Sequence, residues 1–278
     1  MKALAAILAL LVANTSLAAG DDRLPDHRVA EAGGDIVQAW LMMPTDRYRH
    51  FVLGAQYEAA GVRVRLADGS LRDFILPEDS VFEDREPRLV DLDADGRNEL
   101  VLVKSVEGLG ASLTVLGLRN DELQIMAETP PIGRANRWLN PAGFGRFIGN
   151  TRLQIALVRM PHILGRLEIW DYGRGGLILA HTHEGFSNHR IGSRHQRLSA
   201  VLPRHDGTDL LLIPRMDRRE VVLLDLSAQE PVIDEFPLPS PIDGDIQIRC
   251  DRGNFLVNAP LEDGRIENFE IRVPEMKC

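Results

Sequence analysis

An acidic nine-residue segment carries the clearest chemistry in this sequence. Asp91, Asp93 and Asp95 alternate with other residues, a glycine follows, and Glu99 closes the segment. Alternate carboxylates of this kind turn inward around a tight glycine-assisted bend, and the carbonyl group of Arg97 can face the same centre. A shell of hard oxygen ligands suits Ca²⁺, and close carboxylates without a cation would repel each other. We therefore predict one structural calcium site formed by Asp91, Asp93, Asp95, Arg97 and Glu99.

This calcium loop differs from an EF-hand. The twelfth position holds Leu102 instead of a glutamate, and the sequence that follows predicts a strand where an EF-hand has a helix. The alternative interpretation is a solvated aspartate-rich turn without a metal ion. The sequence alone leaves this alternative open.

A second pattern is the recurrence of arginines in three connecting segments: Arg85 and Arg88, then Arg134 and Arg137, then Arg190, Arg194 and Arg197. If these segments meet, their guanidinium groups could bind carboxylate or phosphate groups. The alternative, which is the preferred interpretation, is that they pair with acidic residues such as Glu83, Asp84 and Glu86 of the same kind of connection. The candidate ligand-binding residues are Arg85, Arg137, His189 and Arg190.

Histidines offer a weaker candidate for a metal site. His181 and His183 would lie on one face of a strand, with His189 and His195 further along the chain. Spacing does not fix a third ligand, so solvated loop histidines are the preferred interpretation. The sequence also lacks the nucleophile, zinc-protease and phosphate-loop motifs of common enzyme classes, and we assign no catalytic residue.

The elements that position these residues are strands arranged in repeats. Three similar segments begin at residues 99, 154 and 209, a constant spacing of 55 residues. Each is followed by two further strand-like runs and preceded by one, which makes four antiparallel strands per unit. This organisation predicts an all-β fold, a β-propeller of about five four-stranded blades over residues 36–278. We expect a strand at Ile36 to Leu41 to complete the last blade.

The calcium loop and the Glu-Leu-Val-Leu-Val run after it resemble FG-GAP, or VCBS-type, repeats. The segments Asn136 to Pro141 and Asn188 to Gly192 also look like those of small exported VCBS-repeat proteins of alphaproteobacteria. The resemblance implies propeller blades with Ca²⁺ in the turn between the first two strands of a blade. The two equivalent loops lack the aspartates, so only one blade should bind calcium: they carry Arg146, Ile148 and Asn150, and Val201, Pro203 and His205.

The N-terminus predicts export. Lys2, an apolar run from Ala3 to Ala13 and the small residues before Ala18 form a signal peptide over residues 1–18, followed by a linker over residues 19–35. The apolar run is too short for a transmembrane anchor, which needs roughly 20 residues. We expect a periplasmic or secreted protein, in which Cys250 and Cys278 form a disulfide.

Charge limits the possible partners. The net charge of −9 argues against general affinity for nucleic acid or anionic lipid. The leading hypothesis is a non-catalytic, calcium-stabilised propeller, expected to be a monomer, that binds a protein or glycan in the cell envelope. The alternative is an extracytoplasmic hydrolase or lyase that uses Arg137, His189 and Arg190.

Overall fold

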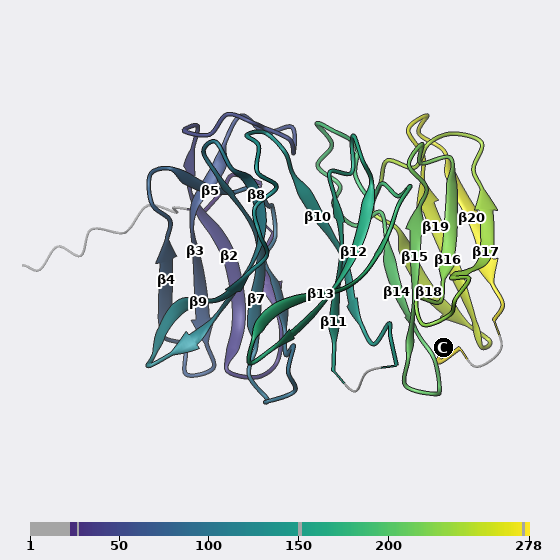
Figure 1. Cartoon of the computed structure of the whole chain (residues 1–278), viewed down its shortest axis with the longest axis horizontal. Coiled ribbons are helices and arrows are strands. Elements are labelled where there is room, and N and C mark those ends of the chain that lie inside the picture. Colours follow the sequence, from purple (N-terminus) through teal and green to yellow (C-terminus); the bar gives the residue numbers. More distant parts are fainter. Residues whose placement is uncertain (1–22, 27, 150–151, 274–275) are drawn as a thin grey trace, which may run out of the picture.

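The computed structural model describes residues 23–26, 28–149, 152–273 and 276–278, and the expected signal peptide lies outside them. The described residues form antiparallel sheets and no helix (Figure 1). Among these residues, no helix has the length and apolar character needed to cross a membrane.

The N-terminal part of the chain forms one nine-stranded sheet. Strand β5 pairs with both β3 and β7, and so it joins two groups of strands that would otherwise be separate units. The strands are β1 (Ala30–Glu31), β2 (Ile36–Thr45), β3 (Glu58–Leu66), β4 (Leu71–Ile75), β5 (Ser80–Phe82), β6 (Arg88–Val90), β7 (Glu99–Val106), β8 (Gly110–Arg119) and β9 (Glu122–Glu128).

Three smaller sheets follow in chain order across the molecule (Figure 1). The first contains β10 (Leu139–Gly145), β11 (Gln154–Arg159), β12 (Arg166–Gly173) and β13 (Gly176–His183). The second contains β14 (Ala200–Pro203), β15 (Asp209–Pro214), β16 (Glu220–Leu224) and β17 (Val232–Pro237). The last contains β18 (Gln247–Asp251), β19 (Asn254–Pro260) and β20 (Ile266–Ile271).

The repeat spacing corresponds to equivalent strands. The segments that begin at residues 99, 154 and 209 are β7, β11 and β15, and each is the second strand of its unit. These strands are buried on both faces because each is packed between two groups of strands. On β7, Leu100 and Leu102 enter one hydrophobic cluster, and Val101 and Val103 enter the next. Each fully buried leucine contributes roughly 2 to 3 kcal/mol to stability. The prediction of an all-β, propeller-type fold is confirmed.

The predicted closure of the last blade is wrong. The strand that contains Ile36 to Leu41 pairs with β1 and β3, and the last sheet keeps three strands. The side chains of Ile36, Ala39 and Leu41 pack into a cluster shared with β3 and β7, which holds this strand in the first sheet. No hydrophobic cluster of the described residues contains side chains from both the first and the last sheet.

The predicted disulfide is confirmed. Cys250 on β18 is bonded to Cys278, with 5.3 Å between their Cα atoms. The C-terminal residues also reach the preceding sheet, where the backbone N–H of Lys277 donates to the carbonyl oxygen of Pro203 at 2.8 Å. The disulfide therefore holds the end of the chain across the last two sheets.

Candidate functional site

The connections that precede β6, β10 and β14 meet at one end of the sheets. The Trp138 indole N–H donates to the carbonyl oxygen of Glu83 at 3.1 Å. The Gln196 amide donates to Asp84 at 2.9 Å, and the Asn140 amide donates to the carbonyl oxygen of Gln196 at 2.9 Å. These buried contacts fix the relative positions of the arginines and histidines that the three connections carry.

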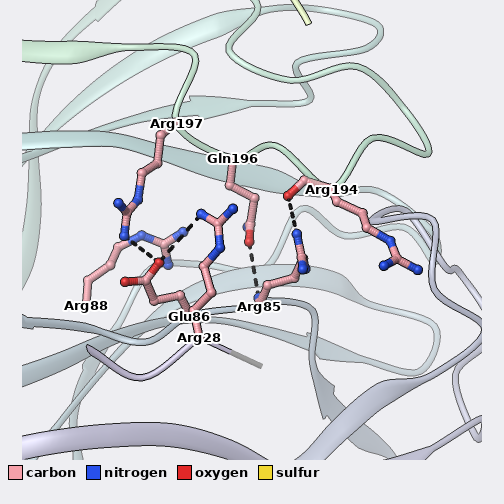
Figure 2. Close-up of a pocket in the computed structure, with 7 residues that line it drawn as sticks. All are labelled: Arg28, Arg85, Glu86, Arg88, Arg194, Gln196 and Arg197. Carbon is pink, nitrogen blue, oxygen red and sulfur yellow. Dashed lines mark hydrogen bonds and ion pairs between the residues drawn. The ribbon is translucent and has the colours of Figure 1, made fainter. Parts of the chain in front are cut away.

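One group of arginines lies between these connections and the N-terminal segment (Figure 2). With Glu86 and Gln196 they surround a cavity of about 30 Å³, which has room for little more than a water molecule. We call this group the arginine cluster: Arg28, Arg85, Arg88, Arg194 and Arg197.

Each member of the arginine cluster pairs with a carboxylate. Arg85 also donates to the backbone oxygen of Arg194 at 2.8 Å. This arrangement matches the alternative interpretation, in which the guanidinium groups hold the connections together. The ion pairs are Arg28–Asp245, Arg85–Asp26 and Arg88–Asp84 at 3.0 Å, Arg194–Asp26 at 3.5 Å, and Arg197–Glu86.

The other three predicted ligand-binding residues line two adjoining cavities, which we call the rim site. Arg137 lines the larger cavity, of about 370 Å³, together with His50, Trp138 and Met160. His189 and Arg190 line the smaller cavity, of about 200 Å³, together with Ser187, Met216 and Arg218. Both cavities share the side chains of His162 and Ile191. The rim site thus contains Arg137, His189 and Arg190, whereas Arg85 belongs to the arginine cluster.

The buried His189 and the partly buried His162 lie between the cavities. The Nε2 atom of His162 lies 2.8 Å from Nδ1 of His189, and Nε2 of His189 lies 3.0 Å from the carbonyl oxygen of Ser193. Burial lowers the pKa of His162 to about 4 and that of His189 to about 3. Both rings are therefore neutral at pH 7.

The three arginines of the rim site differ in their partners. Arg190 forms an ion pair with Asp243 at 2.6 Å. Arg137 donates to the carbonyl oxygen of Asn136, and Arg218 donates to that of Ile242, both at 2.9 Å. Neither Arg137 nor Arg218 has an ion pair with another residue of the described ranges. Burial lowers the pKa of Arg218, which remains a cation.

Another polar group in the larger cavity is His50. Its Nδ1 atom lies 2.7 Å from the Oε1 atom of Glu83, a carboxylate that is almost entirely buried. The other oxygen of Glu83 accepts a hydrogen bond from the Ser105 hydroxyl. Glu83 therefore fixes the orientation of the imidazole, and no hydrogen bond within the described part of the chain engages its Nε2 atom.

Apolar side chains at the larger cavity are unusually exposed. Ile163 is 60% exposed and Ile191 is 59% exposed, and both line the cavity. The neighbouring Leu164 is 42% exposed. Single exposed apolar residues are common, but a group beside a cavity and an unpaired guanidinium is typical of a binding surface.

The predicted calcium loop folds as a tight turn between β6 and β7. Carboxylate oxygens of Asp91, Asp93 and Glu99 lie within 4.8 Å of one another. The N–H groups of Asp95 and Gly96 donate to Asp91 at 3.1 and 3.0 Å. Gly96 adopts a positive φ of 87°, which a glycine accepts without strain. The turn therefore brings three of the predicted ligands together.

Electrostatics in this loop favour a cation. Burial, with the nearby carboxylates of Asp93, Asp95 and Asp91, raises the pKa of Glu99 to about 7. The Oδ1 atom of Asp93 is buried without a hydrogen-bond partner. Asp95 is outside the group of three, and its Oδ1 atom accepts a hydrogen bond from the Arg97 N–H at 2.9 Å. The donor set is all oxygen, which fits Ca²⁺.

Histidines do not form a comparable metal site. Within the described ranges, the acidic group is the only set of three metal-ligating side chains that meets this distance. His181 and His183 lie on the outer strand β13, whereas His189 belongs to the rim site.

Sequence reasoning missed His50, His162 and Arg218. Each is an isolated residue in a segment between two strands, with no partner at a fixed spacing. The only available signal was the cluster of histidines and arginines around His189, which the three-dimensional fold extends with residues from distant turns.

No protein-family model matches the chain, and no curated protein matches it. Among solved structures, the chain is similar to Raptor from Chaetomium thermophilum, with 12% identity and a TM-score of 0.49 over 93% of this chain and 22% of that one. It thus spans about 22% of the Raptor chain.

Two further structures show a similar likeness. One is BBS1N in complex with ARL6DN, with 12% identity and a TM-score of 0.46 over 87% of this chain and 74% of that one. The other is the β-propeller domain of Cps50 (Swd1) from Myceliophteria thermophila, with 12% identity and a TM-score of 0.46 over 80% of this chain and 69% of that one. At such identities the likeness concerns the fold alone.

Proposed function

We propose that this chain is an exported, non-catalytic propeller protein that binds a protein or glycan partner in the cell envelope through the rim site. Calcium would stabilise the turn between β6 and β7 without taking part in binding. The disulfide between Cys250 and Cys278 supports export, because such bonds persist mainly in oxidising compartments.

The observation that carries this proposal is the contrast between two groups of arginines. In the arginine cluster every guanidinium already has a carboxylate partner around a very small cavity. At the rim site, Arg137 has none and lines a cavity of about 370 Å³ beside exposed isoleucines. A cation without a partner next to an open apolar cavity is available to an external anionic group.

The low pKa of His162 supports binding over catalysis. An efficient general base has a pKa near the working pH, and a pKa of about 4 makes this imidazole a weak base at pH 7. His189 is buried and already engaged on both ring nitrogens. The alternative function, a hydrolase or lyase, therefore loses support at the two histidines that line the same cavity as Arg190.

The test is affinity capture with the mature protein from an envelope fraction, followed by direct titration with each purified partner. We compare the wild type with Arg137→Ala and with Arg134→Ala, an exposed arginine of the same connection that lines neither cavity. Loss of a partner in the first variant and its retention in the second supports the proposal. Equal binding by all three proteins would exclude the rim site.

One observation favours the alternative function. The His50 imidazole is held by the buried carboxylate of Glu83, an arrangement that also orients catalytic histidines. Turnover of anionic polysaccharides or esters by the wild type, abolished in His50→Gln and retained in His205→Gln, would establish a hydrolase or lyase. His205 is an exposed histidine outside the rim site.

A further inference from the structure

We propose that the larger rim cavity binds a ligand in which one carboxylate is attached to an apolar group. The carboxylate would pair with Arg137, and the apolar group would cover Met160, Ile163 and Ile191. This inference rests on the proposed function and names the ligand chemistry of the same site.

The charge of the cavity wall selects an anion. Arg137 is the only arginine on the wall, its guanidinium makes only a backbone contact, and no carboxylate is among the lining residues of the described chain. The buried acid Glu83 is already bonded to the His50 ring and to Ser105. A carboxylate ligand can form a two-pronged hydrogen bond with the free guanidinium.

One unpaired guanidinium matches one negative charge. The second rim arginine without an ion pair, Arg218, lines the smaller cavity and is separated from Arg137 by the His162–His189 pair. A ligand phosphate would bring close to two negative charges to a wall with one permanent cation. Monocarboxylates therefore fit the wall better than phosphates do.

The other residues that line the larger cavity favour an apolar group next to the carboxylate. Ile163 and Ile191 are each more than half exposed, and Met160 adds an adaptable thioether side chain. The cavity volume of about 370 Å³ falls in the usual range for small-ligand pockets, roughly 300 to 1,000 Å³. Covering these side chains removes apolar surface from water, which favours binding.

His50 provides a second polar contact. Glu83 holds Nδ1, so that the free Nε2 atom is the nitrogen available to a ligand. In the neutral ring whose Nδ1–H is donated to Glu83, the Nε2 atom can accept a hydrogen bond from an N–H or O–H group of the ligand.

The experiment uses isothermal titration of the mature protein with three probes. Hexanoate represents a free small acid, the peptide Ala-Ala-Ala-Leu represents the end of a polypeptide, and the same peptide with an amidated C-terminus lacks the carboxylate. We expect the amide to bind at least roughly 10-fold more weakly than the acid. Preference for hexanoate or for the peptide acid identifies the source of the carboxylate, and either result supports the inference.

Two variants test the wall. Arg137→Gln should weaken binding of the preferred acid roughly 10- to 100-fold, and Ile191→Ser should weaken this binding several-fold. Arg134→Gln should leave the affinity unchanged. Equal affinity for acid and amide, or no binding of any probe, would overturn the inference. The proposed function stands separately if an envelope partner still depends on Arg137 when these probes fail.

Discussion

Nε2 of His162 lies 2.8 Å from Nδ1 of His189, and this distance fixes the hydrogen positions of both rings. Nε2 of His189 faces the carbonyl oxygen of Ser193 at 3.0 Å, and a carbonyl can only accept, so this nitrogen carries hydrogen. The neutral ring then accepts at Nδ1, and His162 must donate. Adding a proton to His189 would turn two N–H groups toward each other.

The first prediction concerns acid stability. The pKa values of His162 and His189 fall from 6.5 to about 4 and about 3, mainly through burial. The unfolded chain therefore binds more protons below pH 6.5, and the stability present above pH 6.5 is lost as the pH falls toward 4. Each histidine contributes up to about 1.4 kcal/mol per pH unit in this window. Urea unfolding from pH 7.5 to 4.5 measures the slope of the free energy of unfolding against pH.

The matched variants separate these histidines from the carboxylates that also titrate. His162→Gln keeps a donor toward His189 and should reduce the proton uptake on unfolding by about one proton. His205→Gln makes the same substitution at an exposed position outside the rim site and is the matched control. Identical slopes for all three proteins would mean that the buried pair does not titrate as described.

The second prediction concerns calcium. A metal ion that binds only the folded loop must raise the free energy of unfolding, by roughly 2.7 kcal/mol when free Ca²⁺ is 100 times the dissociation constant. We expect thermal unfolding to shift upward with Ca²⁺ and downward with EDTA in the wild type. In Asp93→Ala the two conditions should give one curve, because this variant removes a ligand from the group of three.

Asp206→Ala is the matched control for calcium. Asp206 lies in the equivalent turn between β14 and β15, where it accepts hydrogen bonds from the Thr208 N–H and hydroxyl. This variant should lose some stability with or without Ca²⁺ and keep the calcium shift of the wild type. If EDTA has no effect on the wild type, the loop is a solvated turn and the resemblance to FG-GAP repeats loses its most specific support.

The sequence predicted the strand order of the central units because their alternating and apolar runs recur at a fixed spacing. It misplaced the strand at Ile36 to Leu41, since pairing depends on which side chains share a cluster, and apolar residues such as Leu41 fit several partners. The partners of Arg28 and Arg85 were also out of reach. Asp245 lies far from Arg28 in the chain, and Asp26 lies far from Arg85. Only the fold brings each arginine next to its partner.

The third prediction concerns the disulfide. Replacing Cys278 by serine frees the C-terminal residues and should lower the free energy of unfolding by roughly 3 kcal/mol in the loop-entropy description. The double variant with Cys250→Ser should lose no more than this, because both changes remove the same bond. Denaturant unfolding under oxidising conditions measures the loss. Unchanged stability would mean that the segment around Lys277 is held by its backbone contacts alone.

The last prediction concerns the link between the ends of the propeller. Arg28 in the N-terminal segment pairs with Asp245, which lies just before β18 in the last sheet. No hydrophobic cluster of the described residues joins these sheets, whereas this ion pair connects the N-terminal segment directly to the segment before β18. A double-mutant cycle of Arg28→Ala and Asp245→Ala isolates the pair from other effects. We expect a coupling energy of roughly 1 kcal/mol, reduced at high salt because both side chains are partly exposed.

The pair Arg265–Asp263 is the control, since it lies within one turn at 2.6 Å and joins no separate sheets. Loss of the Arg265–Asp263 pair should leave the N-terminal segment protected in hydrogen exchange. Arg28→Ala should instead increase the exchange rate of the β1 amides. Equal protection in both variants would show that other contacts hold the two ends together.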